Sequence, residues 1–150
     1  MSRERVLIVG GPGVGKTTLA NEERERLGLG HFMCTDTRKQ ADRTGRLHPK
    51  ALYAPASLDG QWSELSQWVA DTWLNVRGPW VIEGVAVVRA LRKWHADNPL
   101  DAPPCTSLLW PTEPRIDLAP RGWQMFDEHD NKLQALLIEW PALGAMVKMR

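Results

Sequence analysis

Eight residues near the start of the chain, Gly10 to Thr17, have the types and the spacing needed to hold a polyphosphate. They read Gly-Gly-Pro-Gly-Val-Gly-Lys-Thr, which matches the phosphate-loop pattern G-x-x-x-x-G-K-[ST] in full. Glycines let the backbone pass close to phosphate oxygens with its N–H groups pointing inward. The lysine reaches the β- and γ-phosphates, and the threonine hydroxyl ligates Mg²⁺. The octet therefore predicts a nucleoside triphosphate site.

The expected ligands of this loop are ATP and Mg²⁺. Seven residues are assigned to nucleotide binding: Gly11, Gly13, Val14, Gly15, Lys16, Thr17 and Thr18. Lys16 is also assigned a catalytic role, because its charge meets the phosphates between which the phosphoryl group moves. Thr17 is also assigned as a Mg²⁺ ligand.

The segments on either side of the loop favour a parallel α/β sheet. Residues 5–9 are the short apolar, β-branched run typical of a buried parallel strand, and residues 16–27 can form a helix whose N-terminus faces the anion. Similar patterns predict strands at 31–34, 80–82 and 106–110 and helices at 61–76, 85–95 and 123–140. Because strands and helices alternate, we expect a P-loop NTPase fold of the kinase type, with four or five parallel strands flanked by helices.

Length and charge narrow the class of protein. A chain of 150 residues is the size of one domain, so we expect residues 1–150 to form a single kinase domain on which the acceptor also binds. This size disfavours helicases, recombinase-type motors and hexameric ATPases. The net charge of +1 gives no global field, and the chain shows neither a signal peptide nor a long apolar run. We therefore expect a cytoplasmic protein without a membrane partner; its oligomeric state is open.

Two acidic residues lie at the C-terminal tips of predicted strands and should meet at the carboxyl edge of the sheet, beside the phosphate loop. Asp36 comes twenty positions after Lys16 and could accept the proton of an attacking hydroxyl, although aspartate is also a common cap of a turn. Glu83 precedes a glycine and could hold Mg²⁺ through water, or be an ordinary acid in the first turn of a helix. We assign Asp36 as the catalytic base and Glu83 as a residue that helps to bind Mg²⁺. Whether Glu83 or Asp36 is the main carboxylate near the Mg²⁺ ion stays open.

A concentrated basic segment follows Asp36. Residues 38–50 contain five lysines and arginines and a single acidic residue. We assign Arg38, Arg43 and Arg46 to acceptor binding, within a substrate-side segment spanning 38–60. The alternative is a solvated charged loop.

Two further arginines flank a proline-rich stretch. Arg115 and Arg121 lie in a lid-like loop over residues 111–122. Arginine suits a transferring phosphoryl group, whose charge needs donors that do not deprotonate. We assign both as catalytic, the alternative being ordinary surface arginines.

The phosphate loop, the strand-tip Asp36 and the nearby Arg38 resemble the small P-loop kinases that include the 5′-polynucleotide kinases of phages. The resemblance implies that Asp36 deprotonates a hydroxyl of DNA or RNA and that lid arginines contact the phosphoryl group. The family's arginine follows its aspartate by three residues, whereas Arg38 follows Asp36 by two. Residues 110–115 (Trp-Pro-Thr-Glu-Pro-Arg) and 121–125 (Arg-Gly-Trp-Gln-Met) are also similar to segments of phage P-loop kinases that phosphorylate 5-hydroxymethyluracil in DNA.

These observations predict an ATP-dependent kinase that transfers the γ-phosphoryl group to a hydroxyl of a nucleic acid or nucleotide. A phage DNA-modification enzyme acting on 5-hydroxymethyluracil is one form of this hypothesis. Two alternatives stay open: a kinase of free nucleosides, nucleotides or other small molecules, and a non-catalytic ATP-binding module that switches a partner.

Overall fold

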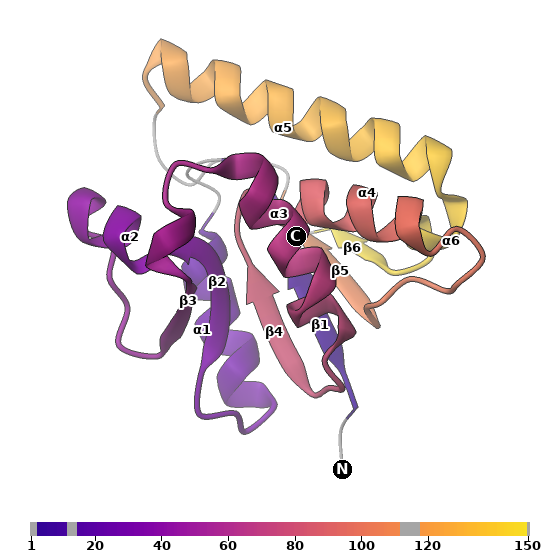
Figure 1. Cartoon of the computed structure of the whole chain (residues 1–150), viewed down its shortest axis with the longest axis horizontal. Helices are drawn as coiled ribbons and strands as arrows, with labels where there is room; N and C mark the ends of the chain where they lie inside the picture. The colour runs from indigo at the N-terminus through magenta and orange to yellow at the C-terminus, as the bar shows by residue number, and fades with distance from the viewer. Residues whose placement is uncertain (1–2, 12–14, 112–117, 150) are drawn as a thin grey trace.

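The computed structural model describes residues 3–11, 15–111 and 118–149 of the chain. Its centre is one sheet in which every pair of neighbouring strands is parallel (Figure 1). The strand order is β3-β2-β4-β1-β5-β6. The strands are β1 (Arg5–Ile8), β2 (Phe32–Thr37), β3 (Ala51–Ala54), β4 (Trp80–Glu83), β5 (Ser107–Trp110) and β6 (Val147–Met149).

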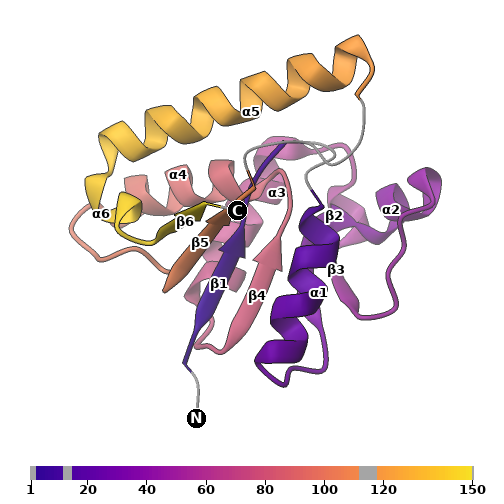
Figure 2. The same cartoon turned by 180° about the vertical axis from the view of Figure 1, so that it is seen from behind.

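Helices cover both faces of this sheet. They are α1 (Lys16–Arg26), α2 (Arg38–Thr44), α3 (Trp62–Asp71), α4 (Val87–Asp97), α5 (Pro120–Glu139) and α6 (Pro141–Gly144), with short 3₁₀ turns at Ala56–Leu58 and Trp73–Asn75. Figure 1 shows α3 and α4 in front of the sheet, and the view from behind in Figure 2 shows α1 on the opposite face.

Alternate side chains along β1 belong to two separate hydrophobic clusters, one on each face of the sheet. Val6 and Ile8 pack with residues of α1, while Leu7 packs with residues of α3, α4 and the second half of α5. Residues of β1 are buried on both faces, which explains why this strand reads as a continuous apolar run. The central strands are thus stabilised by apolar burial on each side.

The order of the strands creates a crevice at the carboxyl end of β1. The chain passes from β1 to β2 on one side, and later from β4 to β5 on the other side of β1. In open parallel sheets this reversal opens a crevice at the strand ends, and ligands bind there. The phosphate-loop residues follow β1 directly, so the topology brings them to this crevice.

The expected parallel α/β sheet flanked by helices is confirmed, but the sheet has six strands rather than four or five. The two unexpected strands are β3 and β6, which lie at the edges and have four and three residues. Neither shows a long apolar run; Leu52 in β3 is 47% exposed. Short, half-exposed edge strands carry too weak a hydrophobic pattern to be recognised without their partners.

Several boundaries also differ from the expected ones. β2 continues to Thr37, because β3 pairs with β2 as far as that residue, and Asp36 lies at the C-terminal tip of the strand as expected. The helix expected at 61–76 is α3 followed by a 3₁₀ turn. The final helix starts at Pro120, and proline is well suited to a first helical turn because its missing N–H is not needed there.

Helix α5 lies along the carboxyl edge of the sheet and touches the phosphate loop (Figures 1 and 2). A Cβ atom added to Gly11 would stand 2.6 Å from the Cα of Phe126 in α5. Phe126 is buried, whereas the neighbouring Gln124 and Met125 are exposed. The close approach of Gly11 to Phe126 therefore anchors the first half of α5 on the loop.

We expect Gly11→Ala to destabilise the protein, because the obstructing atom belongs to the backbone and the helix must move to make room. Overpacking of this kind costs about 1–3 kcal/mol, which lowers Tm by about 2–4 °C for each kcal/mol in a chain of this size. The control is Gly30→Ala, whose added Cβ meets nothing within 4 Å. Thermal unfolding measures both; equal Tm values would contradict the contact.

Candidate active site

Lys16 is the first residue of α1 and points back at the phosphate loop. Its Nζ donates a hydrogen bond to the carbonyl oxygen of Gly11 at 2.9 Å. Gly15 precedes it with φ 81°, a left-handed conformation that glycine adopts readily. Burial lowers the pKa of Lys16, and the carboxylates of Glu83 and Asp36 oppose that shift. A bound polyphosphate would replace the Gly11 carbonyl as partner of this ammonium group.

Thr17 and Glu83 meet directly at the end of β4. The Thr17 hydroxyl donates a hydrogen bond to Glu83 Oε1 at 3.3 Å. Glu83 is only 2% exposed and lies in register with Ile8 of β1 and Cys34 of β2. Burial raises its pKa, while a hydrogen bond from the Cys34 thiol and the charge of Lys16 act against that rise. Glu83 is thus a sheltered carboxylate beside the hydroxyl assigned to Mg²⁺.

The residues at this point fit a magnesium ion bound together with a nucleotide. Thr17 and Glu83 supply hard oxygen atoms, the ligand type that Mg²⁺ prefers. Within the described parts of the chain there is no group of three or more His, Cys, Asp or Glu side chains that could hold a metal by itself. Thr17 would therefore ligate the ion alongside phosphate oxygens and water, and Glu83 would act through a water molecule.

Gly84 continues the chain from Glu83 in a conformation reserved for glycine. Its φ is 136°, and a Cβ atom there would stand 1.9 Å from Thr35 Oγ1. The backbone N–H of Ala86 in turn donates to that same hydroxyl at 3.4 Å. Gly84 thus lets β4 turn directly over β2, which places Glu83 and Asp36 on one cavity.

Asp36 is a partly buried carboxylate held by its strand. Burial raises its pKa, and the positive charges of Lys16 and Arg46 act against that rise. Its side chain has no hydrogen-bond partner among the residues that the structure describes, so its oxygens are free to accept one. This is the arrangement expected of a general base, whose pKa moves toward neutrality in a partly dry site.

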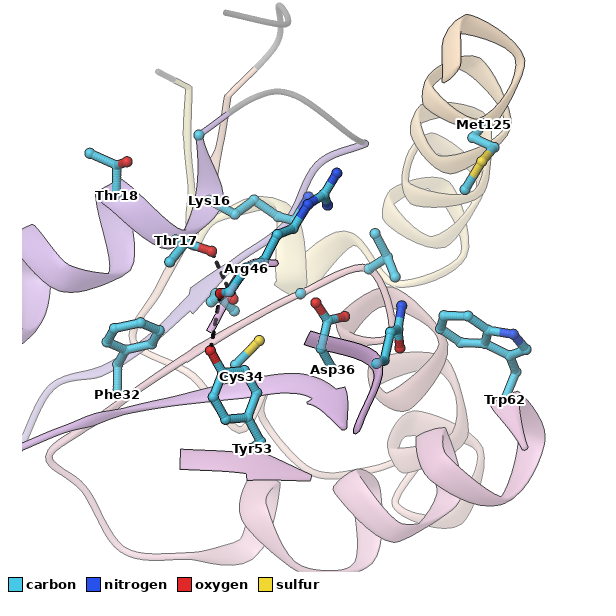
Figure 3. A pocket seen from close by; sticks show the side chains of 15 residues that line it. Lys16, Thr17, Thr18, Phe32, Cys34, Asp36, Arg46, Tyr53, Trp62 and Met125 are labelled. Atoms are coloured by element: carbon cyan, nitrogen blue, oxygen red, sulfur yellow. Dashed lines mark hydrogen bonds between the residues drawn. The ribbon is translucent and has the colours of Figure 1, made fainter. Parts of the chain in front are cut away.

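A cavity of about 430 Å³ joins these groups (Figure 3). Gly15, Lys16, Thr17 and Thr18 line one part of it, and Asp36, Glu83 and Gly84 line the floor. In Figure 3 Thr18 and Phe32 lie on one side, Trp62 on the other, and Asp36 between them. One cavity therefore holds four of the seven residues assigned to nucleotide binding together with the assigned base.

Of the remaining residues assigned from the sequence, some line the cavity and others do not. Arg46 lines the cavity, whereas Arg38 and Arg43 do not. Arg43 is paired with Asp59 at 2.8 Å, which offsets part of the charge of the basic segment. Arg121 is exposed, outside the cavity lining, and donates to Gln124 Oε1 at 3.3 Å. Gly13, Val14 and Arg115 lie outside the described residues, and their roles stay predictions.

Eight cavity-lining residues were not assigned to the site from the sequence: Phe32, Cys34, Gln40, Tyr53, Trp62, Gly84, Val85 and Met125. Trp62 shares a helical period with Leu65 and Val69, a pattern typical of a core face, yet it is 42% exposed at the first position of α3. Met125 comes from α5, nearly ninety residues after Asp36 in the chain. Only the tertiary structure brings such distant segments together.

Comparisons with known proteins add little to this geometry. No family model matches the chain, and no curated protein matches it either. Among solved structures, shikimate kinase from Acinetobacter baumannii in complex with shikimate aligns with 99% of this chain and 82% of that chain, at a TM-score of 0.44 and 15% sequence identity. This likeness is too distant to assign a role to any residue. In the described part of the chain, no helix has the length and apolar character needed to cross a membrane.

We expect Asp36→Asn to raise the stability of the protein at neutral pH. The pKa of Asp36 is higher in the folded state than the ordinary value of 3.8, so the folded state holds the proton more tightly. Stability then falls as pH rises from the unfolded pKa through the folded one. The Asn variant should therefore show a higher Tm at pH 7, and the gain should shrink toward pH 3.

The control is Asp59→Asn, for which the sign is opposite. Hydrogen bonds from Arg43 and Thr37 lower the pKa of Asp59, so its carboxylate stabilises the fold above the ordinary pKa, and this contribution is lost as pH falls through the folded pKa. Its Asn variant should unfold at a lower temperature at pH 7. Calorimetric scans from pH 3 to 7 measure both; a lower Tm for Asp36→Asn at pH 7 would contradict the electrostatic account of Asp36.

Proposed function

We propose that this chain is an ATP- and Mg²⁺-dependent phosphotransferase that moves the γ-phosphoryl group of ATP to a hydroxyl group of an acceptor. One observation carries the proposal: a single cavity is lined by Lys16 and Thr17 and by a carboxylate, Asp36, that lacks a hydrogen-bond partner among the described residues. Phosphate donors and a free proton acceptor are the two parts that phosphoryl transfer to a hydroxyl requires.

The phosphate side would work by positioning and charge. The ammonium of Lys16 meets the β- and γ-phosphates, and the N-terminus of α1 points its free N–H groups at the same anion. Thr17 and, through water, Glu83 hold the Mg²⁺ ion, which neutralises charge on the phosphates when it is bound. These fixed groups stabilise the charge of the transition state without having to reorganise.

The acceptor side would work by proton transfer. The acceptor oxygen attacks the γ-phosphorus and forms the new O–P bond, the bond from that phosphorus to the bridging oxygen of ADP breaks, and the hydroxyl proton passes to Asp36. The raised pKa of Asp36 makes it a better proton acceptor than an exposed aspartate, since base strength follows pKa. Arg115 and Arg121 complete the proposal as lid arginines that meet the phosphoryl group.

We further propose a nucleotide or nucleic acid as the acceptor, including 5-hydroxymethyluracil in DNA in a phage-encoded, cytoplasmic, single-domain enzyme. Arg46 in the cavity and Arg38 nearby on α2 would contact its phosphates. A kinase of free nucleosides or other small molecules is the second candidate. Two observations favour it: the cavity has a volume of about 430 Å³, and Arg43 is already paired with Asp59. A non-catalytic ATP-binding switch would bind ATP through the same phosphate-binding residues but would not transfer a phosphoryl group.

We expect Lys16→Ala to abolish ATP binding, and Asp36→Asn to keep ATP affinity while slowing transfer by about 10² or more, the usual contribution of a general base. Asn keeps the shape of the side chain and loses the proton acceptor. Calorimetry measures binding, and ADP release measures transfer over a panel of nucleosides, nucleotides, oligonucleotides and small alcohols. Asp101→Asn is the control, at an exposed residue outside the cavity lining, and should retain both properties.

Each outcome of this experiment has a distinct meaning. ATP binding by Lys16→Ala would overturn the phosphate-loop assignment. Unchanged turnover of Asp36→Asn would overturn its role as base. ATP binding by the parent protein without stimulation by any hydroxyl compound would favour the switch module.

Salt dependence separates a nucleic acid acceptor from a small one. If the acceptor is DNA, its apparent affinity should fall steeply with ionic strength, because bound phosphates release counterions. Arg38→Gln should reduce the slope of log affinity against log salt by about one, while Arg92→Gln, an exposed arginine on α4, should leave it unchanged. A shallow slope in the parent protein would favour a small acceptor.

A further inference from the structure

The acceptor side of the cavity has an exposed apolar rim. Trp62 at the start of α3 and Met125 on α5 both line the cavity and are 42% and 43% exposed. Figure 3 shows them on the side away from Thr18 and Phe32, with Asp36 in between. An acceptor whose hydroxyl group lies at Asp36 could therefore contact the indole of Trp62 and the thioether of Met125.

Few polar groups on this side are free to bind the acceptor. The hydroxyl of Tyr53 accepts a hydrogen bond from the N–H of His48 at 2.7 Å and donates one to the carbonyl of Arg46 at 3.3 Å. Glu83 is engaged by Thr17. The side chains of Asp36, Gln40 and Arg46 remain, and none has a hydrogen-bond partner in the described part of the chain.

This composition discriminates between kinds of ring. A saturated polyol carries hydroxyl groups around its whole edge, and most of them would lose water without gaining a partner, which is costly. A flat heteroaromatic ring has two apolar faces and only a few polar edge atoms. Its face suits the indole of Trp62, a sulfur such as that of Met125 contacts aromatic rings favourably, and an amide such as Gln40 can donate to and accept from a ring edge.

We propose that the acceptor carries a flat heteroaromatic ring that stacks on Trp62, with Met125 beside it and Gln40 at its polar edge. This inference rests on the proposed function and adds the residues that recognise the acceptor ring, whether that ring is free or part of a polymer. Trp62 and Gln40 are then determinants of specificity, and neither takes part in the proton transfer.

The test is a binding measurement that does not depend on turnover. The probes are thymidine and 5-hydroxymethyl-2′-deoxyuridine as flat-ring compounds, and myo-inositol and ribose as saturated ones, each with a non-hydrolysable ATP analogue and Mg²⁺ present. Calorimetry gives Kd, and saturation-transfer NMR reports which ligand protons lie against the protein. A single-stranded oligonucleotide with the same bases distinguishes a ring within a polymer from a free one.

We expect a flat-ring probe, free or in the oligonucleotide, to bind with its ring protons saturated and the saturated compounds to bind far more weakly. Trp62→Leu should weaken that binding about tenfold or more, the usual loss when a stacking aromatic is removed. Trp62→Phe should restore most of it. The control is Trp123→Leu, an indole that is 45% exposed on α5 but does not line the cavity.

The inference is overturned if no flat-ring probe binds, if the saturated compounds bind as tightly, or if Trp62→Leu binds as well as the parent protein. The wild-type NMR measurement decides the matter even if the Leu variant does not fold. Transfer to a saturated acceptor that depends on Asp36 would keep the proposed function and overturn this inference. Ring binding at Trp62 without any transfer would support the inference and count against the proposed function.

Discussion

The site depends on the partial desolvation of three ionisable groups, Lys16, Asp36 and Glu83, at one end of the sheet. Burial acts against the charged form of each: it lowers the pKa of the lysine and raises the pKa of both carboxyl groups. The charge of Lys16 attracts both carboxylates and opposes these shifts, whereas the charge of Asp36 raises the pKa of Glu83 further. Removing Lys16 would leave both carboxylates buried without its compensating charge. This shared dependence on Lys16 ties the phosphate side of the cavity to its acceptor side.

The backbone makes this convergence possible through parallel pairing. β4 lies between β1 and β2, so Glu83 is in register with both Ile8 and Cys34, and Asp36 follows two residues further along β2. Gly84 then turns away over Thr35 without a side chain in the way. The same packing that buries the apolar strands therefore sets the spacing of the polar groups at their ends, and the stability lost by burying carboxylates is offset by the core beneath them.

Helix α5 connects the two sides of the cavity. Phe126 rests on Gly11 of the phosphate loop, and the preceding residue, Met125, lines the acceptor side near Trp62. The first half of α5 thus contacts Gly11 of the phosphate loop and also supplies part of the apolar rim. In the proposed kinase this contact would make the binding of nucleotide and acceptor interdependent, since each ligand would bias the position of the same helix.

The sequence by itself determined the phosphate loop, the parallel α/β class, the central strands and the two acidic residues at the strand ends, because these depend on local spacing and on continuous apolar runs. It did not reveal β3 and β6, whose short edge segments become strands only when a neighbour pairs with them. It also could not show that Arg43 is paired with Asp59, or that Trp62 and Met125 share a cavity rim. Those features arise from contacts between segments far apart in the chain, and such contacts leave no periodic trace in either segment alone.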